Sequence, residues 1–484
     1  MASKINKITI FSSLFWKLLE RGGVQGIQFI LQIILARLLL PSDYGLVALV
    51  TIFINLARVF VQRGFNTALI QKKEVEEVDY SSVFYISLFV SLILYLILFF
   101  TSPLIASFYK EPQLTKVLRV LSITLFFGAF NSIQNAIIAR NLKFKKLFFS
   151  SLGAIVISGL LGILVAYKGF GVWALVVQQL TNQFLVIIIL WFTVKWRPKL
   201  IFSITRVKVL FSFGWKLLVS SLIDTLYNNL KSLIIGKIYT SDMLGYFNRG
   251  KQFPQLIVTN INGSIQSVIL PVLSAEQENV VRVKDMVRRA IVTSSFIIFP
   301  SMIGLAVIAK PLVLVLLTEK WLPSVPFLQI FCITYSLWPI HTANLQAINA
   351  LGRSDIFLKL EIIKKIVGLI ILGISIRWGV YAIALGGILS GILSMVINAY
   401  PNKRLLNYSF REQLIDIIPS LIISILMGGV IYCVNLFNLI PIIMLIIQIP
   451  LGAIIYIALA KLFKLECYQY LINTIKVLVK NKTN

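Results

Sequence analysis

Polar and basic side chains recur at helical spacing inside two apolar stretches near the start of this chain. In the first stretch they are four, three and four positions apart, a spacing that places them on one face of a helix. They are Arg21, Gln25, Gln28 and Gln32 in residues 14–39, and Asn55 and Arg58 in residues 43–66. The pattern predicts a polar face where an apolar one is expected.

The charged members of these stripes are mostly basic. A guanidinium presents a planar fork of donors that matches phosphate oxygens, whereas an ammonium acts as a point charge. A cationic surface with low-dielectric walls attracts an anionic ligand, such as a pyrophosphate. Arg58 is the strongest basic candidate, because residues near the ends of a span can instead extend to the interface.

Two later stretches also carry polar and basic residues that are candidates for the site. They are Lys231 in residues 209–237, and Arg249, Gln252, Gln255 and Asn262 in residues 243–270. Polar groups inside a membrane are costly and face a cavity or a neighbouring helix. For a single amide, hydrogen bonding between helices is the favoured interpretation. The four stripes together favour the walls of one hydrophilic cavity.

Asp224 is the only carboxylate near the middle of any apolar stretch. A bare buried carboxylate is too costly, so it pairs with a cation or binds a coupling ion, H⁺ or Na⁺. Asn228, one turn later, suits either form. Both interpretations stay open, and Arg58 is the candidate partner in the first.

The composition identifies the elements that carry these stripes. Of the 484 residues, 58% are hydrophobic and 13% are charged, against about 25% charged in soluble domains. This balance predicts a polytopic all-α membrane protein and excludes a soluble enzyme, a disulfide scaffold and a disordered chain. Three scattered cysteines and one histidine predict neither a disulfide framework nor a multi-histidine metal site.

Apolar windows predict fourteen spans. They lie near residues 14–39, 43–66, 80–108, 114–139, 146–167, 171–194, 209–237, 243–270, 289–311, 324–351, 356–376, 380–400, 414–436 and 439–461. Alternate connections carry 28 and six Lys and Arg residues, so the positive-inside rule predicts both termini in the cytoplasm. The net charge of +28 therefore reflects membrane orientation, and no nucleic-acid partner is expected.

The chain also repeats itself. Phe15–Leu19 is similar to Gly214–Leu218, and Ser42-Asp43 recurs as Ser241-Asp242. Parallel repeats of this kind relate two halves about an axis along the membrane normal, with the substrate site between them; a duplicated membrane anchor is the alternative. The predicted domains are an N-lobe of spans 1–6 (1–200), a C-lobe of spans 7–12 (201–405) and two extra helices with a tail (406–484).

One segment has the spacing of a nucleotide-binding P-loop but not the residue types that such a loop needs. Gly245, Gly250 and Lys251 have the spacing of a P-loop, but Gln252 stands where Ser or Thr is needed and no strand precedes it. No ATP site, other cofactor or enzymatic activity is expected.

Five segments of the chain carry recognisable motifs: Leu35–Val50, Phe60–Lys73, Ile235–Leu256, Ser267–Ser274 and Leu351–Ser354. They resemble the polysaccharide exporter family, which comprises the O-antigen, colanic acid and teichuronic acid flippases within the multidrug/oligosaccharidyl-lipid/polysaccharide superfamily. The resemblance implies a V-shaped pair of six-helix lobes, as in MATE transporters, with two extra C-terminal helices.

The resemblance also implies a function. The substrate would be an undecaprenyl-pyrophosphate-linked oligosaccharide, passed outward across the bacterial cytoplasmic membrane by alternating access and an ion gradient. Polymerase and other polysaccharide assembly proteins would be partners, besides the lipid bilayer. A lipid II flippase, a cation-coupled drug exporter and, less favoured, a membrane-embedded polymerase are the alternatives.

Overall fold

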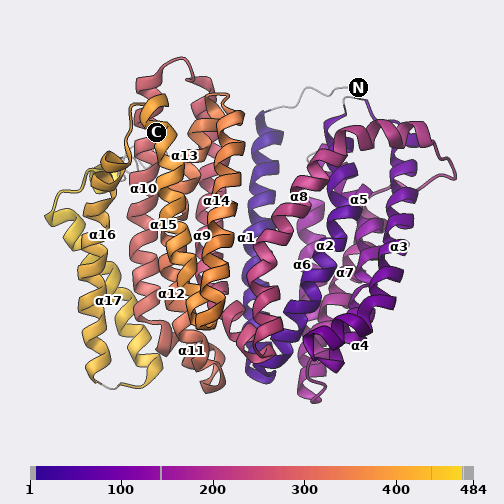
Figure 1. The fold of residues 1–484 in the computed structure, drawn as a ribbon, viewed down its shortest axis with the longest axis horizontal. Helices are drawn as coiled ribbons and strands as arrows, with labels where there is room; N and C mark the ends of the chain where they lie inside the picture. Colours follow the sequence, from indigo (N-terminus) through magenta and orange to yellow (C-terminus); the bar gives the residue numbers. More distant parts are fainter. Residues whose placement is uncertain (1–6, 73, 142–143, 438, 471, 474–484) are drawn as a thin grey trace. The chain divides into compact units, whose positions relative to one another are not determined.

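The computed structural model describes residues 7–72, 74–141, 144–437, 439–470 and 472–473. Throughout these ranges the regular structure is helical, with no strand. The chain divides into two compact units, Met1–Gly245 and Tyr246–Asn484. Figure 1 shows the helices of each unit.

The first unit holds eight α-helices and the start of a ninth among its described residues. These are α1 (Lys7–Leu38), α2 (Pro41–Gln71), α3 (Glu77–Tyr109), α4 (Pro112–Leu121), α5 (Thr124–Arg140), α6 (Phe144–Tyr167), α7 (Trp173–Thr193), α8 (Ile204–Ile238) and the first turn of α9 (Ser241–Ala275). The unit extends past the predicted boundary at residue 200, because α8 packs along α2. The lobe boundaries drawn from the repeat stay a prediction.

The second unit holds the rest of α9 and eight further α-helices in the described part of the chain. They are α10 (Val280–Val307), α11 (Ala309–Leu317), α12 (Val325–Ser336), α13 (Trp338–Ala350), α14 (Ser354–Ser375), α15 (Val380–Leu405), α16 (Phe410–Cys433) and α17 (Pro441–Leu462). Short 3₁₀ turns cover Glu319–Ser324, Ile376–Trp378 and Val434–Phe437. Helix α16 packs along α10 and α17 packs along α16 (Figure 1).

Each predicted span coincides with one helix or with two consecutive helices, such as α4 with α5 and α12 with α13. Within the described residues, nine helical segments are long and apolar enough to cross a membrane, or ten if the bent α8 counts as one span. The polar stripe of α9 lowers its hydropathy, and the break between α12 and α13 shortens both helices. The count of fourteen is therefore consistent with the helices but stays a prediction.

Small residues allow close packing in the first unit. Ser87 Oγ donates to the Val61 carbonyl at 3.5 Å, and Ser91 Oγ donates to the Leu125 carbonyl at 3.2 Å. These two buried serines lie on α3 and bind carbonyls of α2 and α5. Small and hydroxylated residues pack membrane helices in this way, because apolar burial gains little within lipid.

A buried carboxylate anchors the start of α3. Asp79 has no exposed side-chain surface, lies 2.6 Å from Lys72 Nζ and lies 3.8 Å from Arg206 Nη1. Its Oδ2 also accepts from the Glu76 backbone N–H at 2.9 Å, which caps α3. Arg206, near the start of α8, additionally contacts Glu76 at 3.0 Å. The cluster ties the beginning of α8 to α3.

Buried amides join three helices of the second unit. Asn344 on α13 and Gln413 on α16 exchange two hydrogen bonds of 2.8 and 3.0 Å. Asn402 on α15 donates to Asn344 Oδ1 at 2.5 Å. All three residues are buried, so α16, the first of the two predicted extra helices, is bound into the core of this unit.

Candidate functional site

Arg58 lies in α2, away from both ends of the helix. Its Nε is buried without a hydrogen-bond partner, and no hydrogen bond or ion pair joins it to any described residue. A cation inside a membrane-spanning segment is costly, and such residues normally pair or line a substrate path. Arg58 is therefore a donor group whose partner the described part of the chain does not supply.

Amides surround the α2–α5 contact near Arg58. One turn along α2, Gln62 Nε2 donates to the Gly128 carbonyl at 3.3 Å. A Cβ on Gly128 would lie 2.9 Å from that nitrogen, so a larger residue there would displace the Gln62 amide. Asn131, one turn further along α5, is buried with its Oδ1 unsatisfied. Asn55 is half-buried on the preceding turn of α2.

The stripe on α1 is partly solvent-accessible. Gln25 and Gln32 are half-buried and Gln28 is exposed, whereas the side chain of Arg21 lies outside the described residues. Helix α1 packs along α6, with Leu31 against Gly159. By helical position Gln28 lies on the side of Leu31, whereas the exposed Ile30 and Ile34 lie on the side of α1 opposite the glutamines.

Helix α8 carries the candidate coupling residues. Asp224 and Asn228 are exposed and Lys231 is half-buried. Arg58 and Asp224 form no ion pair in the structure, although both lie in the first unit. An exposed carboxylate within a membrane segment requires water or a polar partner, because lipid offers neither.

Arg249 on α9 differs from Arg58. It is buried, its Nη1 donates to Gln252 Oε1 at 2.6 Å, and its guanidinium lies 5.1 Å from the centre of the Trp321 ring. Cation–π contact and the amide bond hold this charge inside the second unit. Asn262 is also buried, and Gln255 is half-buried.

The predicted site residues belong to both units, and their assembly into one cavity stays a prediction. Arg58 and Asn55 share α2, and Asp224, Asn228 and Lys231 share α8, the helix packed along α2. The residues Arg249, Gln252, Gln255 and Asn262 belong to the second unit. Gln62 belongs to the same polar stripe of α2 as Asn55 and Arg58. The buried amide of Asn131 was not predicted, although the helical spacing of Asn131 and Gln134 was an available signal.

The P-loop-like spacing and the Leu351–Ser354 motif lie in helical surroundings. Residues 245–251, which have P-loop spacing, lie inside α9 and form no loop. In the Leu351–Ser354 motif, Arg353 contacts Asp355 at 3.0 Å, and this guanidinium holds the pKa of Asp355 at about 2. In the described part of the chain, no three His, Cys, Asp or Glu residues cluster as metal ligands.

Comparison with known proteins decides the family. The model of a family described as polysaccharide biosynthesis proteins matches residues 34–326, more than half of the chain. The chain belongs to this family. The match covers the segments Leu35–Val50 and Ile235–Leu256, so the resemblance inferred from them is confirmed.

Two curated members of similar sequence are bacterial. The teichuronic acid biosynthesis protein TuaB of Bacillus subtilis is 26% identical over 303 residues, which are 62% of this chain and 62% of TuaB. The lipopolysaccharide biosynthesis protein WzxC of Escherichia coli is 23% identical over 430 residues, 85% of this chain and 86% of WzxC. The chain thus matches somewhat less than two thirds of TuaB and most of WzxC.

Solved structures establish the fold. The lipid II flippase MurJ in an inward closed conformation superposes with a TM-score of 0.77 and 18% identity, covering 95% of this chain and 100% of MurJ. An inward-facing MATE multidrug resistance transporter of the MOP superfamily gives 0.60 at 17% identity, covering 80% of this chain and 96% of the transporter. The family member is therefore an all-α, multi-pass membrane protein with the fold of that superfamily.

Proposed function

We propose that this polysaccharide biosynthesis protein is a flippase that moves an undecaprenyl-pyrophosphate-linked oligosaccharide outward across the bacterial cytoplasmic membrane. Alternating access by a transporter fold would carry the substrate, and both termini would lie in the cytoplasm. One observation carries the proposal: Arg58 is a membrane-embedded guanidinium with a buried Nε and no hydrogen bond or ion pair to a described residue. A pyrophosphate supplies the acceptors that this fork lacks.

The fold and the residue types support a transporter in preference to an enzyme. Translocation requires a polar path and no bond cleavage, and helices α1, α2 and α8 carry amides, cations and the mid-helix carboxylate of Asp224. Coupling to H⁺ or Na⁺ through Asp224 and Asn228 belongs to the same proposal. A polymerase and other polysaccharide assembly proteins are the expected partners, since they would use the translocated glycan.

The test removes the guanidinium. Arg58→Ala should abolish or strongly reduce glycan export while membrane abundance stays normal, because no hydrogen bond or ion pair to a described residue is lost. Arg58→Lys should restore export only in part, since the charge stays and the fork geometry is lost. Arg377, exposed on the Ile376–Trp378 turn, is the matched control, and Arg377→Ala should export normally. Normal export by an abundant Arg58→Ala protein would refute the role.

Lipid II is the second candidate substrate, favoured by the superposition on MurJ. Both substrates carry a pyrophosphate, so Arg58 serves either. Deleting the gene separates them: the proposal expects a lipid-linked polysaccharide repeat unit to accumulate on the cytoplasmic side. Accumulation of lipid II instead would assign the second substrate.

A further inference from the structure

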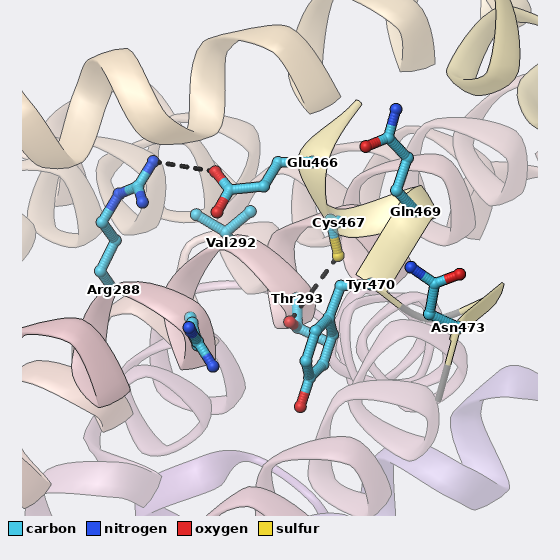
Figure 2. A pocket seen from close by; sticks show the side chains of 9 residues that line it. Arg288, Val292, Thr293, Glu466, Cys467, Gln469, Tyr470 and Asn473 are labelled. Carbon is cyan, nitrogen blue, oxygen red and sulfur yellow. Dashed lines mark hydrogen bonds and ion pairs between the residues drawn. The ribbon is translucent and has the colours of Figure 1, made fainter. Parts of the chain in front are cut away.

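A second candidate site lies between α10 and the segment that follows α17. A pocket of about 210 Å³ opens there, far along the chain from Arg58 (Figure 2). Its lining residues are Arg288, Arg289, Val292, Thr293, Glu466, Cys467, Gln469, Tyr470 and Asn473. A water molecule occupies about 30 Å³ of liquid, so the pocket holds a small polar group and not an oligosaccharide.

The two arginines of the pocket are not equivalent. Arg288 is committed to carboxylates, at 2.9 Å from Asp416 and 3.1 Å from Glu466. Arg289 is exposed, forms no ion pair with a described residue, and lies with its guanidinium 5.8 Å from the centre of the Tyr470 ring. Arg289 therefore brings a positive charge that the surrounding protein does not neutralise.

Thr293 adds a directional donor. The Cys467 thiol donates to Thr293 Oγ1 at 3.7 Å (Figure 2), and burial raises the pKa of Cys467, which keeps the thiol protonated. Because Thr293 accepts this bond, its own hydroxyl proton stays available to a ligand. The pocket combines an uncompensated guanidinium with a hydroxyl donor and an apolar wall at Val292.

The position along the chain indicates the source of a ligand. The predicted orientation puts residues 276–289 and the chain after residue 461 at the cytoplasmic membrane surface. Arg and Tyr are typical of such interfaces, and basic pockets between helices on this side hold anionic headgroups. The exposed Lys461 and Lys464 nearby in sequence add positive charge.

We propose that this pocket binds the phosphodiester headgroup of an anionic phospholipid of the cytoplasmic leaflet, with Arg289 as the charged donor. The bound lipid bridges α10 and the segment after α17, which also contact through Arg288–Glu466, Cys467–Thr293 and Arg289–Tyr470. The site depends on the predicted orientation and is independent of the transported glycan.

Native mass spectrometry of the full-length protein with phosphatidylglycerol tests the proposal, together with thermal unfolding in detergent. Phosphatidylglycerol should bind and raise the unfolding temperature. Arg289→Gln should weaken binding about tenfold and remove most of the thermal shift. Arg411, an exposed arginine of α16 outside the pocket, is the control, and Arg411→Gln should bind as the unmodified protein does.

Three outcomes would overturn the proposal. Equal binding of phosphatidylcholine would remove the requirement for a net negative headgroup. An equal thermal shift with inorganic phosphate or glycerol phosphate would identify a soluble phosphate as the ligand. If Arg289→Gln and Arg411→Gln lost phosphatidylglycerol binding equally, the lipid would be held by general surface charge and not by this pocket.

Discussion

Gly45 and Ser241 meet where the first turns of α2 and α9 touch: a Cβ on Gly45 would lie 1.8 Å from the Ser241 carbonyl oxygen. The contact is reciprocal, since a Cβ on Gly245 would lie 2.1 Å from the Pro41 carbonyl oxygen. Ser42-Asp43 and Ser241-Asp242 are the repeated dipeptides of these turns. Two repeated sequences thus pack against each other through glycines that no larger residue can replace without a backbone shift.

The first prediction concerns this contact. Gly45→Ala or Gly245→Ala should force the two turns apart and reduce both export and the thermal stability of the protein, because each added methyl meets rigid backbone. Gly373→Ala on α14 is the control, since no atom lies within 4 Å of that Cβ position. The interpretation fails if Gly45→Ala exports and unfolds as Gly373→Ala does.

The second prediction concerns the buried carboxylate of α3. Lys72→Ala leaves Asp79 without its nearest cation and should lower the free energy of unfolding by about 1–3 kcal/mol. Arg206→Ala should lower the free energy of unfolding less than Lys72→Ala does, because Arg206 lies 3.8 Å from Asp79 whereas Lys72 lies 2.6 Å from it. Thermal unfolding in detergent measures both. Glu74→Ala, at an exposed position, should change little, and the reverse order of Lys72 and Arg206 would contradict the geometry.

The third prediction concerns the reciprocal amide pair. Gln413→Ala should lower the free energy of unfolding by about 1–3 kcal/mol, because it leaves buried donor and acceptor atoms of Asn344 with fewer partners. Replacing both residues with leucine should cost less than the sum of the single leucine changes, since no half of the pair then stays unsatisfied. A double-mutant cycle from thermal unfolding checks this. Strict additivity would show that the two amides do not interact.

The fourth prediction concerns Asp224. Asp224→Asn should leave abundance unchanged, because the side chain is exposed, but should remove the dependence of export on an ion gradient. Transport into inverted vesicles with and without a proton or sodium gradient measures the effect. Asp242→Asn, in the first turn of α9, is the control. Full gradient dependence in Asp224→Asn would exclude this carboxylate as the coupling group.

The fifth prediction concerns orientation. A cytoplasm-active reporter fused after Asn484 should be active, and one inserted after Lys168 should not, because the Lys and Arg distribution predicts these sides. Periplasm-active reporters should give the opposite pattern. Activity of the Asn484 fusion only outside the cell would reject the fourteen-span topology.

The sequence by itself determined the helices and the family. Hydropathy and the spacing of apolar residues are local properties, so α2, α3 and α6 lie where the windows predicted them. The motif segments likewise identified the family that the comparison confirms. The hydropathy windows did not predict the short breaks between helices. Helix α10 ends at Val307 and α11 begins at Ala309, where one continuous span to residue 311 was expected.

Only the tertiary structure decided which polar residues are satisfied within the protein. Arg58 and Arg249 are the same residue type in similar helical stripes, yet Arg249 lies over Trp321 and Arg58 bonds to no described residue. Asn344 and Gln413 are likewise distant in sequence. Hydrogen bonds and ring contacts depend on which helices become neighbours, and periodicity within one helix contains no information about the residues that face it.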